Sequence, residues 1–134
     1  DIKHNEAIDA LRKRIETCSK EVPVVPKTLQ AQLRDYQEEG FEWMSRLTAW
    51  GAGVCLADDM GLGKTVQTIT LLLEQSAHGA SLIVAPASVV PNWRNELKRF
   101  APTLNLLYSI RARIAQKILR KPRLVMSLSL LMHY

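Results

Sequence analysis

The stretch Asp58-Asp59-Met60-Gly61-Leu62-Gly63-Lys64-Thr65 decides how this chain folds. It follows an apolar run at 53–57 and precedes a helical pattern of apolar residues at 66–73. A strand, a glycine-containing loop, Lys-Thr and a helix together make the context of a phosphate-binding loop. The glycines let backbone N–H groups turn toward an anion, and the helix N-terminus adds partial positive charge. The stretch therefore predicts an α/β domain that binds a nucleotide.

Two side chains of this loop have predicted chemical roles. Lys64 reaches the terminal phosphates of ATP and the Thr65 hydroxyl ligates Mg²⁺, so both are candidate catalytic residues. The other loop residues are expected to line the nucleotide: Asp58, Asp59, Met60, Gly61, Leu62 and Gly63. An ordinary turn before a helix is the competing interpretation, which the flanking patterns disfavour.

Asp58 stands where the general phosphate-loop pattern has its first glycine. An acidic residue followed by Met-Gly-Leu-Gly-Lys-Thr resembles the loop of superfamily 2 helicase-like ATPases. The segment Leu-Ala-Asp-Asp-Met-Gly-Leu-Gly-Lys-Thr-Val-Gln-Thr at 56–68 closely resembles the Swi/Snf-type branch of DNA translocases and chromatin remodellers. The resemblance covers about residues 29 to 100, with a weaker tail to 134, and implies part of a RecA-like lobe that binds MgATP.

Upstream, Leu33-Arg34-Asp35-Tyr36-Gln37 resembles the adenine-recognition motif of the same family. By that resemblance Gln37 reads the edge of adenine, with Leu33 and Arg34 near the base. An amide suits this task because it offers both a donor and an acceptor. The alternative is a surface glutamine on an amphipathic helix.

Downstream, residues 83–97 resemble the next family motif, an apolar strand followed by Ala-Pro and by Asn-Trp at the start of a helix. The resemblance implies DNA contacts at Ser88, Asn92, Arg94 and Lys98. The helical spacing of Trp93 favours a core position instead, and Ser88 is equally suited to cap the following turn.

The composition predicts a folded intracellular domain. The chain has 134 residues, 47% of them hydrophobic, without an apolar run long enough for a membrane span and without a signal-peptide segment. Cys18 and Cys55 are expected to be small core residues rather than a disulfide or a metal site. We expect the cytoplasm or nucleoid in a bacterium and the nucleus in a eukaryote.

The net charge of +5 is distributed unevenly. Residues 1–90 carry nine Lys/Arg against twelve Asp/Glu, whereas residues 91–134 carry nine Lys/Arg against one acid, Glu96. This asymmetry favours a polyanion as the partner of the C-terminal portion, and the resemblance specifies double-stranded DNA. The alternative is a solvated helix face that only aids solubility.

Hydrophobic periodicity divides the chain into an N-terminal helix with a Pro-containing linker at 1–27 and a truncated lobe at 28–134. We expect a mostly parallel sheet flanked by helices. The expected helices are 4–19, one from Asp35, 64–77, 92–100 and a basic one at 110–121; the expected strands are 53–57, 81–85 and 104–108. Residues 123–131 resemble the strand-plus-turn motif that the family shows next. Aromatic residues on the helix from Asp35, including Tyr36 and Trp43, are expected in the core. Leu128 replaces the family's usual aromatic residue after Ser127, which argues against a DNA contact there.

ATP hydrolysis in the resembled family also needs an Asp-Glu pair and arginines from a second lobe, and neither is found in these residues. We therefore expect the 134 residues alone not to turn over ATP, and to self-associate through an open sheet edge. Three functions remain: a Swi/Snf-type motor on duplex DNA, sometimes within protein complexes on DNA; an RNA or single-strand helicase; and a nucleotide-binding interaction module without turnover. The residues of the motifs at 58–63 and 91–93 favour the motor on duplex DNA.

Overall fold

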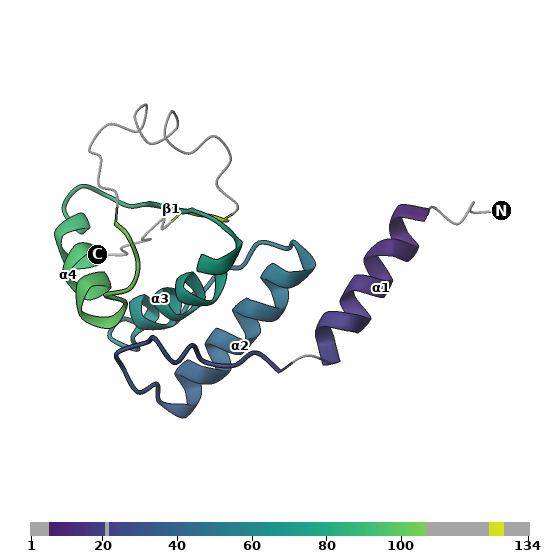
Figure 1. The fold of residues 1–134 in the computed structure, drawn as a ribbon, viewed down its shortest axis with the longest axis horizontal. Helices are drawn as coiled ribbons and strands as arrows, with labels where there is room; N and C mark the ends of the chain where they lie inside the picture. Colours follow the sequence, from purple (N-terminus) through teal and green to yellow (C-terminus); the bar gives the residue numbers. More distant parts are fainter. Residues whose placement is uncertain (1–5, 21, 107–123, 128–134) are drawn as a thin grey trace.

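The computed structural model describes residues 6–20, 22–106 and 124–127 (Figure 1). Its elements in chain order are α1 (Glu6–Lys20), α2 (Asp35–Trp50), α3 (Lys64–Gln75), the 3-10 turn η1 (Ser76–His78), β1 (Ser81–Val84), α4 (Val90–Phe100) and β2 (Leu124–Ser127). Within these ranges, no helix combines the length and the apolar character that crossing a bilayer requires. The expected helices near 4–19, from Asp35, at 64–77 and at 92–100 are confirmed within a few residues.

Helix α3 is central because it contacts both α2 and α4. One buried cluster joins α3, α4 and the linker: Leu29, Ile69, Leu72, Leu73, Trp93, Leu97 and Ala101. A second joins α2 and α3: Phe41, Met44 and Leu71. A hydrogen bond also joins α2 to α3, because the Ser45 hydroxyl donates to Glu74 Oε1 at 2.6 Å. Apolar residues on two sides of α3 thus fix the helix that carries Lys64 at its first turn.

Strands β1 and β2 pair in parallel, with Ser81 opposite Leu124 and Val84 opposite Ser127. Parallel neighbours need a crossover connection, and α4 lies within it. The expected strand at 81–85 and the strand of the motif at 123–131 are therefore found at 81–84 and 124–127. β1 is less buried than its apolar sequence suggested, because Val84 is exposed. The expected basic helix at 110–121 and residue Leu128 lie outside the described residues.

Two segments that were expected to be strands, 53–57 and the described part of 104–108, are not strands in the structure. Residues 53–57 have no ladder partner among the described strands, since β1 pairs with β2, and an apolar run becomes a strand only beside a neighbour that bonds its backbone. Cys55 is consequently exposed rather than buried in a strand. Residues 104–106 are not a strand either, because Leu104 N–H donates back to Ala101 O at 3.0 Å in a turn. Residues 107–108 lie outside the described part, and so does the Cys18 side chain.

Helix α1 lies at the end of the molecule far from α4 in Figure 1, and it contacts α2. Arg14 Nη2 donates to the Ala49 carbonyl of α2 at 3.2 Å, while Ile8 and Leu11 remain exposed. The linker that follows is fastened to the lobe, since Gln30 N–H donates to Phe100 O at 2.8 Å. Leu29 beside it is buried in the core.

Candidate nucleotide-binding site

The backbone of the 58–65 loop is shaped for an anion. Gly61 and Gly63 have φ of 83° and 78°, in the left-handed region that glycine adopts without a steric penalty. Gly63 is the N-cap of α3, no side chain caps this helix among the described residues, and Gln67 N–H donates to Gly63 O at 3.2 Å. The backbone N–H groups in the first turn of α3 have no acceptor within the helix. They and the helix dipole make this end a site for phosphate.

Lys64 lies across the loop. Its Nζ donates to the carbonyl oxygens of Asp58 and Asp59, at 2.7 Å each. The two aspartates thus contribute their backbone to the ammonium, while their side chains are exposed. A phosphate oxygen is a stronger acceptor than a carbonyl, so it would take over the lysine from these two groups. Thr65, the next residue, is half-buried in the first turn of α3.

Gln37 joins the upstream motif to the loop. Its Nε2 donates to Leu62 O at 3.1 Å and to the Tyr36 hydroxyl at 3.4 Å, and its Oε1 accepts the Arg34 N–H at 3.0 Å. Gln37 is only 9% exposed, so the alternative of a surface glutamine is wrong. Its Oε1 keeps a second lone pair for a ligand donor such as an exocyclic amine.

Leu33 and Arg34, which the resemblance puts near the base, do not contact the loop in the way that Gln37 does. Leu33 is half-buried and packs against both core clusters. Arg34 is exposed at the N-terminus of α2. In the loop, Met60 is 87% exposed and Leu62 is 37% exposed, so the backbone of this segment is better placed than its apolar side chains to hold a ligand.

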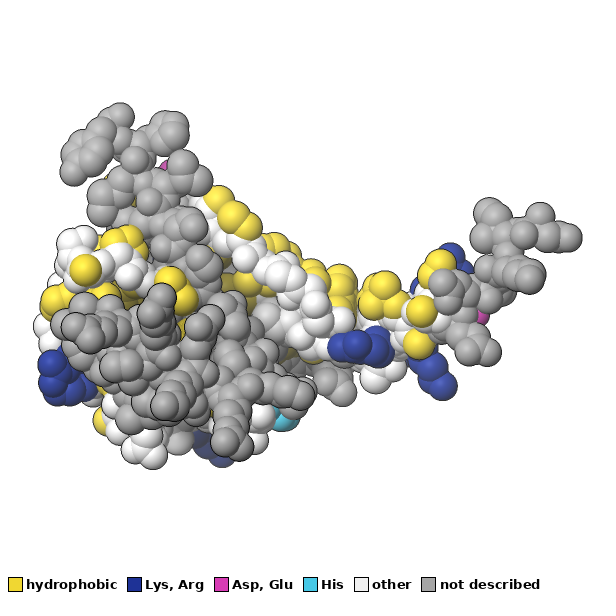
Figure 2. Space-filling model, turned by 90° about the horizontal axis from the view of Figure 1, so that it is seen from above, with side chains coloured by type: hydrophobic (Ala, Val, Ile, Leu, Met, Phe, Trp, Pro, Cys, Tyr) yellow, Lys and Arg dark blue, Asp and Glu magenta, His cyan; other side chains and the backbone are white. Residues whose placement is uncertain are grey.

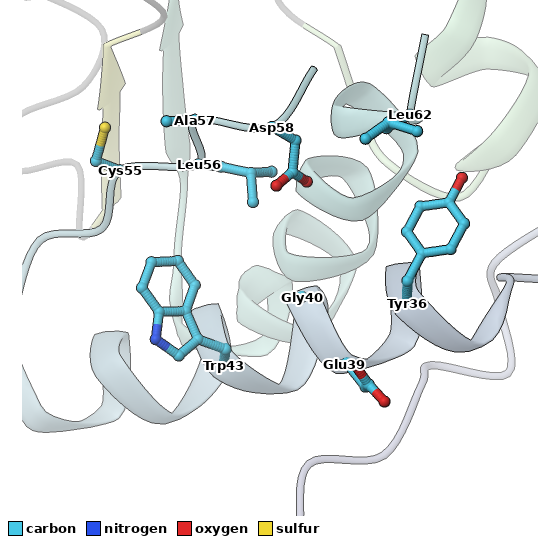
Figure 3. Close-up of a pocket in the computed structure, with 9 residues that line it drawn as sticks. All are labelled: Tyr36, Glu39, Gly40, Trp43, Cys55, Leu56, Ala57, Asp58 and Leu62. Carbon is cyan, nitrogen blue, oxygen red and sulfur yellow. The ribbon is translucent and has the colours of Figure 1, made fainter. Parts of the chain in front are cut away.

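A pocket of about 560 Å³ lies beside the loop, between α2 and residues 55–62 (Figure 3). Its lining residues are Tyr36, Glu39, Gly40, Trp43, Cys55, Leu56, Ala57, Asp58 and Leu62. The expectation that Tyr36 and Trp43 belong to the core is wrong, because they are 38% and 43% exposed. The face of α2 that packs on α3 carries Phe41 and Met44 instead. The seven-residue spacing of the two aromatic residues was the signal that they share a face of their own.

The residues expected to contact DNA lie on α4 and on the turn before it. Ser88, Asn92, Arg94 and Lys98 are exposed, and none of them lines the pocket beside the loop. Trp93 is 8% exposed within the core, which confirms the expectation from its spacing. No described side chain caps α4, so the capping role considered for Ser88 is not observed.

Comparisons with known proteins agree with this geometry. Residues 36–131 match the family model of the SNF2-related domain. The chain is 48% identical over 86 residues to the chromatin-remodeling ATPase INO80 of Cryptococcus neoformans, covering 61% of this chain and 5% of that protein. It is 49% identical over 86 residues to the helicase SWR1 of Mycosarcoma maydis, again covering 61% and 5%. The ISWI chromatin-remodeling complex ATPase CHR17 of Arabidopsis thaliana is 47% identical over 83 residues, covering 59% of this chain and 8% of the relative.

Solved structures show the same similarity. The Sulfolobus solfataricus SWI2/SNF2 ATPase core in complex with dsDNA matches with a TM-score of 0.63 and 38% identity, covering 78% of this chain and 23% of that chain. The Sulfolobus solfataricus SWI2/SNF2 ATPase core domain matches with a TM-score of 0.63 and 37% identity, covering 81% of this chain and 23% of that chain. The chain thus spans a small part of the relatives it matches. Because the family model covers well over half of its residues, the chain belongs to the family of SNF2-related domains.

Proposed function

We propose that this chain is the ATP-binding N-terminal part of a DNA-dependent ATPase of the Swi/Snf type, which couples hydrolysis to movement along double-stranded DNA. The observation that carries the proposal is the contact between the two nucleotide motifs, in which Gln37 Nε2 donates to Leu62 O one residue before the N-cap of α3. Membership in the SNF2-related domain family and the dsDNA complex of a structural neighbour support it.

Each residue of the site has a proposed role. Lys64 binds and neutralises the terminal phosphates, Thr65 holds Mg²⁺ through its hydroxyl, and the loop N–H groups hold the remaining phosphate oxygens. Gln37 orients adenine, with Leu33 and Arg34 beside the base. Bound MgATP supplies the phosphoryl group whose transfer to water drives movement. Asp58, Asp59, Met60, Gly61, Leu62 and Gly63 shape the loop around the phosphates.

DNA is the proposed partner, together with protein complexes assembled on it. Ser88, Asn92, Arg94 and Lys98 would contact the duplex, since all four are exposed on α4 or the turn before it. We also propose that the lobe begins near residue 28 and belongs to a RecA-like domain with a mostly parallel sheet, of which β1 and β2 are two strands. Such a protein acts where DNA is, in the nucleus of a eukaryote or the nucleoid of a bacterium.

The test is ATP hydrolysis by the full protein that contains this chain, without nucleic acid and with duplex DNA, single-stranded DNA or RNA. Duplex DNA should stimulate hydrolysis most, and Lys64→Ala should lower the rate by at least about a hundredfold through lost phosphate stabilisation. Lys27→Ala, an exposed lysine of the linker, is the matched control and should retain the rate.

Other outcomes separate the alternatives. Stimulation mainly by RNA or single strands would replace the translocase with a helicase of superfamily 2. ATP binding without hydrolysis under every condition would favour the nucleotide-binding interaction module.

A further inference from the structure

The pocket beside the phosphate loop contains residues to which nucleotide binding gives no role. Tyr36 and Trp43 stand seven residues apart on α2 with Gly40 between them, and both rings rise from the helix toward residues 55–62 (Figure 3). The Asp58 carboxylate points from the opposite side into the gap between the two rings. We call this pocket the α2 cage.

The spacing of the two aromatic residues suits a single cation between them. Seven helical residues advance about 10 Å along the axis, so a group held midway is about 5 Å from the level of each residue. A cation within about 6 Å of a ring centroid is attracted by the negative face of the ring. Tyr36 and Trp43 are 38% and 43% exposed, so a ligand can reach both from solvent. The pocket volume of about 560 Å³ is large enough for a whole amino-acid side chain.

The charges around the α2 cage are mostly negative. Asp58 and Glu39 line the pocket, and no ion pair to either carboxylate is found in the part of the chain that the structure describes. The Lys64 ammonium donates to the backbone carbonyl of Asp58 rather than to its side chain. The one basic residue of α2, Arg46, is paired with Glu42 at 2.8 Å. The α2 cage thus offers aromatic faces and an unpaired carboxylate to a positively charged ligand.

We propose that the α2 cage binds the ammonium group of a lysine side chain that projects from a partner protein. The ammonium lies between the two rings and pairs with the Asp58 carboxylate, while its four-carbon stem packs on Leu56 and Leu62. A compact ammonium on a flexible stem enters such a gap, whereas a planar guanidinium stacks flat on one ring. Because Gln37 and Lys64 do not line the cage, this contact to a basic protein segment is distinct from nucleotide binding.

The experiment measures binding of short Gly-Ser peptides to the full protein that contains this chain, at low salt and without nucleotide. Saturation-transfer-difference NMR suits it, because the method detects weak ligands of large proteins. A peptide with one central lysine should bind at least about threefold more tightly than the same peptide with norleucine, which keeps the stem and lacks the charge.

Substitutions in the α2 cage test the two kinds of contact separately. Trp43→Leu should weaken binding of the lysine peptide at least about threefold, whereas Trp43→Phe keeps an aromatic face and should retain most of it. Asp58→Asn should weaken binding several-fold, because it removes the carboxylate that points into the gap. Glu38→Gln removes the same unit of charge from an exposed position of α2 outside the cage, so it is the matched control and should leave binding unchanged. Circular dichroism checks that each variant folds.

The outcomes distinguish this inference from the proposed function. Trp43→Leu should keep the DNA-stimulated ATPase rate, so failure of one activity does not imply failure of the other. Equal affinity for the lysine and norleucine peptides would make the pocket a plain apolar cleft and overturn the proposal. Equal losses in Asp58→Asn and Glu38→Gln would reduce the effect to general attraction of charge and overturn it too. Binding of tetramethylammonium ion without binding of the lysine peptide would assign the cage to a small cation rather than to a protein partner.

Discussion

At the scale of single residues, Gly61 and Gly63 look alike in sequence but meet different surroundings. Both have positive φ, yet a Cβ on Gly61 would meet nothing within 4 Å, whereas one on Gly63 would overlap Gln37 Nε2. The first glycine is required by backbone conformation alone. The second is favoured by conformation and by the close approach of the Gln37 side chain.

Alanine substitutions should separate these two causes. Gly61→Ala should lower the free energy of unfolding by about 1 kcal/mol, the usual range for a non-glycine residue in the left-handed region. Gly63→Ala should cost up to about 1 kcal/mol more, because the end of the Gln37 side chain must move away and lose its hydrogen bond to Leu62 O. Urea denaturation of the two variants checks the difference. Equal losses would mean that the contact between Gln37 and the loop is not important for stability.

Gln67 is a second residue whose surroundings decide its effect. It is fully buried, and no described residue forms a hydrogen bond with its Oε1 or Nε2, so burial of the amide opposes folding. Gln67→Met keeps the length of the side chain without the amide and should raise the free energy of unfolding by about 1 kcal/mol or more. The exposed Gln32→Met is the control and should change it little. A loss of stability in Gln67→Met would show that the amide has a partner in solution.

At the scale of elements, the two faces of α4 lie in different surroundings. Its inner face inserts Trp93 and Leu97 into the main core cluster, which fixes the helix against α3. Its outer face carries two exposed basic side chains, Arg94 and Lys98. The inner face therefore governs stability, whereas the outer face is open to solvent.

Leu97→Ala should lower the free energy of unfolding by about 2–4 kcal/mol, because it opens a cavity where Leu97 is 5% exposed. Leu106→Ala makes the same chemical change where the side chain is 40% exposed, and it should cost less than about 1 kcal/mol. Denaturant unfolding of both variants gives the comparison. Similar losses would place Leu97 outside the core.

At the scale of the whole molecule, large apolar side chains remain on the surface. Figure 2 shows hydrophobic side chains along the face that runs from the lobe toward α1. The exposed set includes Ile8, Leu11, Val22, Val24, Trp43, Met60, Val84 and Leu106. Exposed apolar side chains that gather on one face promote association. Among the described residues, β1 and β2 have no further strand beside them, and such sheet edges carry unpaired backbone groups.

The 134 residues produced alone should therefore self-associate. Light scattering should give an apparent mass that rises with protein concentration, and Trp43→Glu with Val84→Lys should reduce that rise, because both residues are exposed apolar side chains. Lys27→Ala, a change of an exposed charged residue, should leave it unchanged. A constant monomer mass at all concentrations would contradict the prediction.

Local sequence determined the helices and the site that depends on them. Glycines before Lys64-Thr65 and the apolar period of α3 settle the loop and the helix, because left-handed backbone and 3.6-residue periodicity are properties of a few neighbouring residues. The same reasoning placed Trp93 in the core. Family resemblance gave Gln37 an expected place at adenine, whereas its hydrogen bond to Leu62 O in the loop is known from the structure alone.

Only the tertiary structure decided which apolar segments pair and which faces become buried. Residues 53–57 have the composition of a strand, but a strand requires a neighbour in space, and the described part of the chain supplies one for β1 rather than for them. Tyr36 and Trp43 share a helix with Phe41 and Met44, yet α3 packs on the latter pair and leaves the aromatic pair beside a pocket. Burial depends on where the partner helix lies, and that position is set by long-range packing that the periodicity of one helix does not contain.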